Sequence, residues 1–253
     1  AAASPALMTA VLARGATYRV GYGLIALALA VVAAAFVITR RAWGVTAADG
    51  ARESRANQRA SSSWAALKSR AVQLQLLTFF VYTGTEMGAG QWSYTVLTEA
   101  RGLDAVRAGE WVTAYWASLF VGRVVLGFVV RKIGTVRLLR VALVAAAVGA
   151  SAFAFVPQPS VIAGFGLCLL GFSLAPVFPG LMAETPRRVG DDLAAHSVGF
   201  QVSAGTLGVA VLPNAAGLLS QRFGLPAVAM FFALTTALLL MLHELLVSRT
   251  RAL

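Results

Sequence analysis

Long apolar stretches alternate with short polar ones along most of the chain. A helix needs about 20 residues to cross a bilayer, and seven stretches are long enough to do so. They run over residues 19–39, 71–97, 109–130, 137–156, 160–183, 196–219 and 225–247. The pattern therefore predicts an all-α, polytopic membrane protein with seven transmembrane helices.

Two stretches fall outside these predicted spans. Residues 1–13 are apolar but too short to cross a bilayer, so we expect them to be the tail of a preceding helix. Residues 40–70 are basic and rich in Ser, Ala and Gly, which is typical of a linker. We therefore expect residues 1–39 to end a truncated N-terminal bundle, 40–70 to form a cytoplasmic linker, and 71–253 to form a six-helix bundle.

The six predicted spans after the linker divide into two groups of three. The first span of one group is interrupted by Gly84, Gly88 and Gly90, and the first span of the other by Pro176 and Pro179. Helices broken at corresponding positions of two halves are a sign of an inverted-repeat transporter. We therefore expect the last six helices to form a 3+3 inverted-repeat bundle.

Composition and charge place the chain in a membrane. Charged residues make up 12% of the chain, against about a quarter in soluble domains, and the mean hydropathy is +0.77. The net charge of +11 would suggest nucleic acid for a soluble chain. Here, however, 15 Lys and Arg residues fall on one side of the predicted spans and 5 on the other. This asymmetry predicts an outside N-terminus, a cytoplasmic C-terminus, and lipid instead of nucleic acid as the partner. The excess of Arg and Ala hints at a GC-rich genome and so at a bacterial inner membrane.

One acid stands in the middle of an apolar stretch. Glu86 lies midway along residues 71–97, where a charged side chain costs about 2.5 kcal/mol or more. Two interpretations remain open: Glu86 binds a substrate hydroxyl or titrates during transport, or it is a structural acid that is protonated or bonded to a neighbouring helix.

One face of the predicted helix around this acid is polar. At 100° per residue, an arc of about 80° holds Tyr82, Glu86, Gly90 and Ser93. Gly84 and Gly88 lie on the opposite face, where small residues let another helix pack closely. We therefore expect the polar face to line a cavity and the glycine face to contact a neighbour.

Several short motifs occur in a characteristic order and spacing. They are Tyr18-Arg19-Val20-Gly21-Tyr22, Tyr82-Thr83-Gly84, Gln91-Trp92-Ser93-Tyr94, Tyr115-Trp116, Gly122-Arg123, Pro176-Val177-Phe178-Pro179, Gly199-Phe200-Gln201 and Pro213-Asn214. Together they resemble the major facilitator superfamily, and within it the fucose-permease-like branch of sugar and proton symporters. The resemblance implies twelve helices in two six-helix bundles. This chain would then hold the last helix of the first bundle and the complete second bundle.

The resemblance also implies a function. It is secondary active, proton-coupled transport of a small solute by alternating access, with a sugar as one candidate. The missing N-terminal six-helix half would be the partner of this chain. In fucose permease the proton-titrating carboxylates belong to that half, so no coupling residue is carried over. The family's loop motif matches only partly from Gly127 to Arg137, because Arg131 stands where the family has Asp.

The outward half of the span around Glu86 carries candidate substrate contacts. Gln91, Trp92 and Tyr94 combine amide and aromatic groups, which suits a sugar, although an interfacial aromatic belt explains the aromatics as well. Tyr115 presents the same choice. Amides in the sixth span, Gln201 and Asn214, either bond between helices or contact substrate. The candidate substrate-binding residues are Tyr82, Glu86, Gln91, Trp92, Ser93, Tyr94, Tyr115, Gln201 and Asn214.

Other polar residues are candidates for a gate. Arg123 either extends its side chain to the cytoplasmic interface or pairs with Glu184 at the inner end of the fifth span. Pairing would make it part of an inner gate. The candidate gate or structural residues are Arg123, Arg131, Glu184, Pro176 and Pro179.

The sequence gives no support to an enzyme. It contains no HExxH, paired CxxC or P-loop motif, so we expect no catalytic residues, metal or cofactor. Two alternatives are a seven-helix receptor or retinal protein and a non-transporting scaffold. A retinal protein needs a lysine in residues 225–247, which have none, and a receptor usually shows an extracellular Cys pair, whereas this chain has only Cys168. The scaffold remains open.

Overall fold

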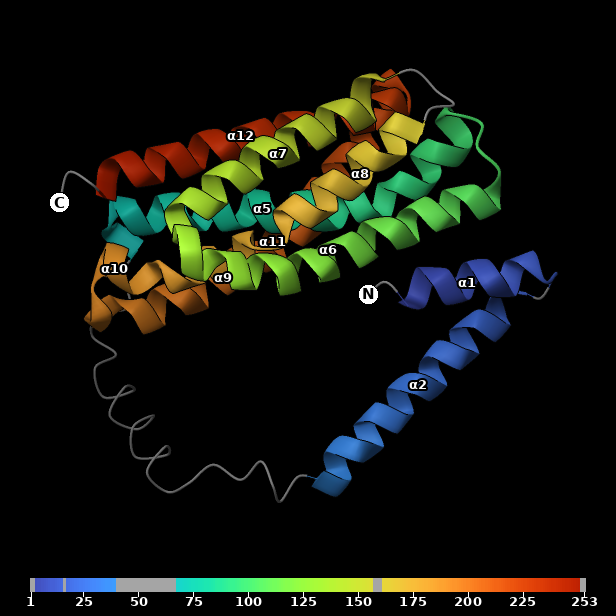
Figure 1. Ribbon diagram of the computed structural model, residues 1–253, viewed down its shortest axis with the longest axis horizontal. Coiled ribbons are helices and arrows are strands. Elements are labelled where there is room, and N and C mark those ends of the chain that lie inside the picture. The colour runs from blue at the N-terminus through green and yellow to red at the C-terminus, as the bar shows by residue number, and fades with distance from the viewer. Residues whose placement is uncertain (1–2, 16, 40–66, 157–160, 251–253) are drawn as a thin grey trace.

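The computed structural model describes residues 3–15, 17–39, 67–156 and 161–250, and these residues contain no strand (Figure 1). The helices are α1 (Ala3–Ala13), α2 (Tyr18–Thr39), α5 (Arg70–Thr95), the π-helix η3 (Val96–Ala100), α6 (Ala105–Ile133), α7 (Thr135–Phe155), α8 (Val161–Leu174), α9 (Val177–Ala183), α10 (Thr185–Val189), α11 (Asp191–Phe223) and α12 (Pro226–Thr250). The predicted all-α class is confirmed. The predicted linker lies outside the described residues except for 67–70.

Among the described residues, six helical segments are long and apolar enough to cross a membrane. They are Tyr18–Thr39, Ala105–Ile133, Thr135–Phe155, Val161–Ala183, Leu193–Phe223 and Pro226–Arg249. These correspond to six of the seven predicted spans. The seventh, α5, has 26 residues and is therefore long enough, but side chains such as Gln73, Gln75 and Thr78 make it more polar. Gln75 and Thr78 are buried inside the bundle, whereas Gln73 is exposed.

The helices after the linker pack in a two-fold pattern. The first helix of one repeat, α5, packs against α11 and α12, and the first helix of the other, α8, packs against α6 and α7. The third helices, α7 and α12, also contact each other and run side by side in Figure 1. Each three-helix repeat therefore inserts its first helix between the second and third helices of the other, which confirms the predicted 3+3 bundle.

Glycines allow these inserted helices to approach their neighbours closely. A Cβ atom on Gly84 of α5 would lie 2.6 Å from the carbonyl oxygen of Gly208 in α11. A Cβ atom on Gly149 of α7 would likewise lie 2.6 Å from the carbonyl oxygen of Gly166 in α8. Gly88 of α5 faces the Phe232 ring of α12. The prediction that Gly84 and Gly88 form a packing face is thus confirmed.

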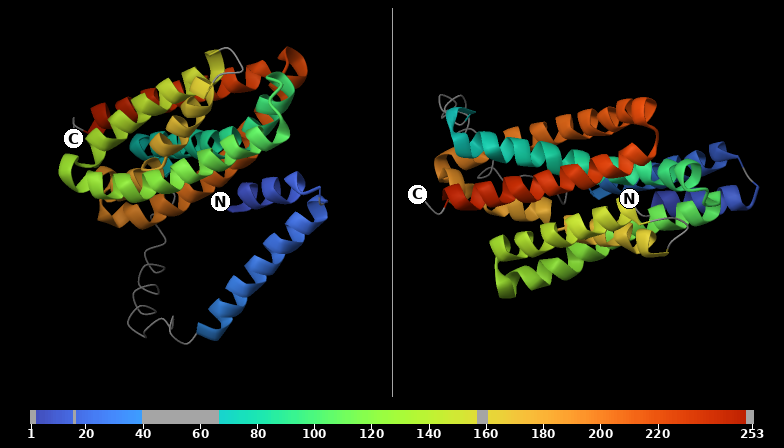
Figure 2. Two further views of the ribbon diagram at one scale, coloured as in Figure 1. Left: turned by 45° about the vertical axis from the view of Figure 1, so that its right-hand side comes forward. Right: turned by 90° about the horizontal axis from the view of Figure 1, so that it is seen from above.

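The two ends of the bundle have different components. We call one end the α10 end, because α10 and the C-terminus of α12 lie there, and the other the η3 end, where η3 leads into α6 (Figure 1). At the η3 end α1 packs on α6, where Gly109 meets the Thr9 side chain. The following helix, α2, contacts α1 and then diverges from the bundle (Figure 2), and Gly21 is its one buried residue.

Candidate functional site

The acid of α5 is held inside the bundle by three side chains. Glu86 is 5% exposed, and the hydroxyl of Tyr82, one turn earlier, donates to its Oε2 atom. Arg123 of α6 places Nη2 3.4 Å from Glu86 Oε1. Tyr115, also on α6, donates its hydroxyl to the backbone carbonyl of Glu86 at 2.7 Å. Glu86 therefore connects α5 to α6 through both its carboxylate and its backbone.

The expectation that this polar face lines a cavity is met only at Gly90, which borders a cavity between α1, α5 and α6, while the other three residues pack inside the bundle. Tyr82 is fully buried and Ser93 is 1% exposed, with its hydroxyl donating to the carbonyl of Ala89. The open face of α5 instead carries Gln91 and Tyr94 toward the η3 end. Helical periodicity fixes which residues share a face, but an acid that finds its partners on a neighbouring helix is stabilised in the packed interior.

Of the two interactions considered for Arg123, the pairing with Glu184 is not formed, and Arg123 pairs with Glu86 instead. Glu184 follows α9 and is bonded to Arg187, three residues later, at 3.3 Å. Arg123 lies ten residues before the end of α6 at Ile133, or about 15 Å along the helix, which places it level with Glu86 instead.

A cavity of about 240 Å³ lies next to Arg123, toward the α10 end. Pro176 and Pro179 line it together with Arg123, so three of the five candidate gate residues meet at the break between α8 and α9. The other two do not. Glu184 is bonded to Arg187. Arg131 is exposed in the last turn of α6, where its positive charge interacts favourably with the dipole of the helix.

A second cavity, of about 360 Å³, opens between α5 and α11 toward the η3 end. Its lining residues are Gln91, Trp92, Thr95, Val209, Pro213 and Asn214. Three candidate substrate-binding residues, Gln91, Trp92 and Asn214, therefore come together from two helices. We call this space the polar cavity.

The polar cavity combines an aromatic wall with hydrogen-bonding groups. Trp92 Nε1 donates to the carbonyl of Pro213 at 3.0 Å, which ties α5 to α11. Because Pro213 has no N–H, the carbonyl of Val209 one turn earlier loses its usual helical partner. Asn214 uses one amide N–H on the carbonyl of Ala210 at 2.6 Å. Sequence reasoning missed Val209, although a proline inside a predicted span was the signal for it.

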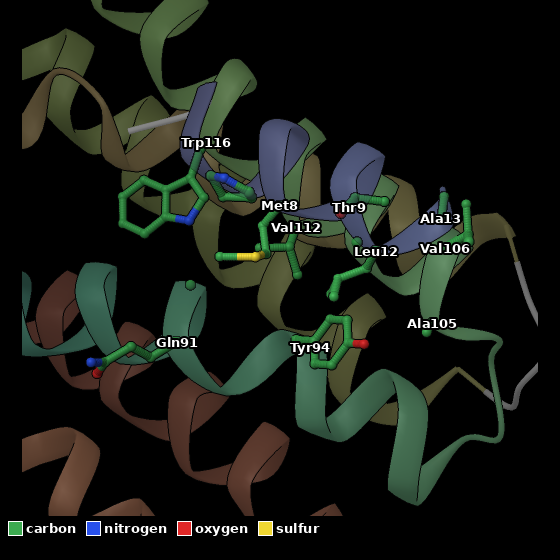
Figure 3. A pocket seen from close by; sticks show the side chains of 13 residues that line it. Met8, Thr9, Leu12, Ala13, Gln91, Tyr94, Ala105, Val106, Val112 and Trp116 are labelled. Atoms are coloured by element: carbon green, nitrogen blue, oxygen red, sulfur yellow. The ribbon is translucent and has the colours of Figure 1, made fainter. Parts of the chain in front are cut away.

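A third cavity, of about 460 Å³, is bounded by α1, α5 and α6 (Figure 3). We call it the apolar cavity, because its wall includes Met8, Leu12, Tyr94, Val112 and Trp116. Tyr94 therefore faces a different space from Trp92. Gln91 lines both the apolar and the polar cavity.

The family of the chain follows from a sequence comparison. The sequence model of the Major Facilitator Superfamily matches residues 1–213. The chain belongs to this superfamily. The resemblance expected from the sequence motifs is thereby confirmed at the level of the family, and the chain is a multi-pass membrane protein.

Solved structures of the superfamily share the fold. A crystal structure of a variant of the E. coli fucose:proton symporter, FucP, matches with a TM-score of 0.66 and 17% identity. A structure of a superfamily transporter, FucP, in the outward conformation matches with a TM-score of 0.65 and 18% identity. Both matches cover 74% of this chain and 45% of the solved chain. At this identity the likeness shows the fold.

A curated relative is also similar in sequence. The chain is 25% identical over 188 residues to "Bypass of stop codon protein 6" of Saccharomyces cerevisiae. The match covers 68% of this chain and 36% of the yeast protein. The chain thus spans less than half the length of this yeast protein and of the solved FucP chains.

Gln201 lies far from the polar cavity. It is fully buried at the α10 end, where its Nε2 atom donates to Gln75 of α5 at 2.7 Å and to Thr185 of α10 at 3.0 Å. It precedes Asn214 by 13 positions on α11, or about 20 Å of helix. Gln201 therefore fits the interhelical alternative.

Among the described residues, no group of three or more His, Cys, Asp and Glu side chains could hold a metal ion.

Proposed function

We propose that this chain contains the end of the first half and the complete C-terminal half of a secondary transporter that carries a small hydroxylated solute with protons by alternating access. The observation that carries the proposal is the interhelical pair of Glu86 and Arg123, only five residues along α5 from the Gln91 side chain that lines the polar cavity. A proton site and a solute site would then share one helix, about 7 to 8 Å apart along its axis.

Glu86 is the proposed proton site. A proton on its carboxylate removes the negative charge that holds Arg123, so the contact between α5 and α6 weakens. Arg123 then presents an uncompensated charge to the cavity at Pro176 and Pro179, where α8 gives way to α9. The free energy of binding a proton to Glu86 therefore depends on whether the Glu86–Arg123 pair is formed. Such a dependence is the requirement for coupling proton binding to a conformational change. Carboxylates within membrane helices commonly serve as proton relays.

The polar cavity is the proposed solute site. The amide groups of Gln91 and Asn214 and the carbonyl of Val209 supply donors and acceptors for hydroxyl groups. The Trp92 ring supplies an apolar wall whose orientation is fixed by its bond to Pro213. A few placed polar groups beside an aromatic surface suit a sugar ring, which has hydroxyls at its rim and C–H groups on its faces.

The proposed partner is an N-terminal six-helix half, against which the bundle of α5 to α12 rocks. Two observations support it: α2 is apolar and almost entirely exposed, and the chain covers 45% of the fucose:proton symporter structures. In this proposal residues 1–39 end the first half, 40–70 form the cytoplasmic linker, and 71–253 form the second half. The η3 end faces outward, the α10 end faces the cytoplasm, and the membrane is a bacterial inner membrane.

Uptake by the complete transporter, with both halves, tests the proposal. Proteoliposomes would be given radiolabelled D-glucose, D-galactose or L-fucose, with and without an inward proton gradient. We expect accumulation that requires the gradient, and we expect Glu86→Gln to retain solute exchange while losing gradient-driven accumulation. Glu99→Gln is the matched control, because Glu99 is an exposed acid in η3. Accumulation by Glu86→Gln equal to that of the unmodified transporter would exclude Glu86 as the coupling site.

Reading the coding sequence upstream of Ala1 tests the partner separately. We expect further hydrophobic spans in the same reading frame. A promoter and start codon directly before this segment would instead favour a seven-span product.

A further inference from the structure

Two cavities of opposite character meet at one residue. Gln91 lines the polar cavity, with Trp92 and Asn214, and also the apolar cavity, with Tyr94 and Trp116. Figure 3 shows the Gln91 amide pointing away from the α1 side chains Met8 and Leu12. The polar end of Gln91 is thus turned away from the apolar wall, and the side chain forms a boundary between the two spaces.

We infer that the transported solute is amphipathic: a hydroxylated ring carrying an apolar substituent, as in an aryl or alkyl glycoside. This inference rests on the proposed function and names its substrate class. The ring occupies the polar cavity, Gln91 binds a hydroxyl near the glycosidic oxygen, and the substituent lies in the apolar cavity. A free sugar would fill only the first space.

The size of the apolar cavity supports a substituent of substantial volume. An apolar cavity of about 150 Å³ in a protein interior suffices to bind benzene. The apolar cavity here has about 460 Å³ and is therefore large enough for a fused bicyclic aryl group. The Trp116 ring and the Met8 thioether are surfaces that pack well against such a group.

The position of the apolar cavity gives the substituent a role in coupling. Its wall comes partly from α1, which precedes α2 in the proposed N-terminal half, and partly from α5 and α6 of the C-terminal bundle. A ligand in this space contacts both halves, and its affinity therefore depends on how they are placed. A free sugar in the polar cavity contacts α5 and α11, which belong to the same bundle.

Inhibition by a glycoside series tests the inference in the complete transporter. Methyl, phenyl and 2-naphthyl glycosides of D-glucose, D-galactose and L-fucose would compete against uptake of the labelled free sugar. Burying one methylene, or its equivalent in aryl area, improves affinity about fourfold, so the naphthyl glycoside is expected to bind at least about tenfold tighter than the methyl glycoside.

Variants of α1 and α6 separate the cavity from general membrane partitioning. Ala13→Phe and Val106→Trp both place a ring in the apolar cavity, and we expect each to abolish the advantage of the naphthyl glycoside. Ala10→Phe is the matched control, because Ala10 is exposed on α1 and does not line the cavity. The size-exclusion profile of every variant reports whether the protein is folded.

Each outcome bears on one claim. Loss of the naphthyl advantage in both cavity variants, and its retention in Ala10→Phe, supports the inference. An equal advantage in all variants would mean partitioning into the bilayer, and methyl and naphthyl glycosides of equal potency would mean a free-sugar transporter; either result overturns the inference and leaves the proposed function standing. Absence of gradient-driven uptake for free sugars and glycosides alike would overturn the proposed function itself.

Discussion

The first helices of the two repeats, α5 and the α8–α9 pair, occupy corresponding places but differ in chemistry. Each is inserted between two helices of the other repeat, and each does so through glycine, at Gly84 in α5 and Gly166 in α8. However, α5 is continuous through its middle and carries Glu86, whereas α8 ends at Leu174 and α9 begins at Val177. Similar packing therefore supports a charged helix in one repeat and a broken helix in the other.

The acids of the two segments show what this difference means. Glu86 lies mid-bundle and takes its cation from another helix, whereas Glu184 lies at the end of α9 and takes its cation, Arg187, from the following turn. A local pair moves as a unit with its own segment, but an interhelical pair must break when the two helices separate. If α5 and α6 separate in the proposed transport cycle, the Glu86–Arg123 pair must break, whereas the Glu184–Arg187 pair can stay intact.

The largest expected effect is on the packing that the two repeats share. Gly84→Leu and Gly166→Leu place side chains where a Cβ atom would already lie within 3 Å of a neighbouring backbone oxygen, at Gly208 and Gly149. We expect each to lose about 3 kcal/mol of stability and to reduce the yield of folded protein in a size-exclusion assay after heating. Gly199→Leu is the control, because a Cβ atom there meets no atom within 4 Å. If only one glycine proves sensitive, the repeats do not pack equivalently.

The second prediction removes the cation of the charged helix. Arg123→Met leaves the buried Glu86 carboxylate without its cation, although Tyr82 still donates to it, and such losses cost about 3–5 kcal/mol in fully buried pairs. The Arg123 side chain is 51% exposed, so we expect a smaller loss of about 2 kcal/mol in thermal stability. Combining it with Glu86→Gln should restore at least half of that loss. A double variant as unstable as the sum of the single variants would show that the two side chains do not interact.

The third prediction concerns the bond between α5 and α11. Trp92→Phe removes the hydrogen bond to the Pro213 carbonyl while keeping an aromatic ring, so we expect a loss of about 1 kcal/mol. Trp111→Phe is the matched control. The Trp111 ring of α6 packs on Gly164 of α8, at the contact between the second helix of one repeat and the first helix of the other. We also expect Trp92→Phe, but not Trp111→Phe, to weaken solute binding in the uptake assay. If the two substitutions weaken solute binding equally, Trp92 does not contribute specifically to the solute site.

The sequence predicted the elements of this comparison better than their contacts. Hydropathy identified the spans, and the spacing of Gly84 and Gly88 identified the packing face of α5, because both signals are local properties of a helix. The extent of the cavity-lining face of α5 and the partner of Arg123 could not be predicted, since both depend on which helix lies alongside. The polar cavity likewise depends on Trp92 and Pro213, which are 121 positions apart, and no local pattern connects them.

The smallest expected effect comes from removing the cation of the local pair. Arg187 is 78% exposed and only three residues from Glu184, and such pairs contribute little. Arg188 also lies near Glu184: burial lowers the pKa of its guanidinium, and the negative charge of Glu184 opposes this shift without cancelling it. Glu184 therefore keeps a nearby cation when Arg187 is lost, and we expect Arg187→Met to cost less than about 0.5 kcal/mol in thermal stability and to leave gradient-driven uptake intact. Damage as large as that of Arg123→Met would mean that the interhelical position of the Glu86 pair is not what distinguishes α5 from α9.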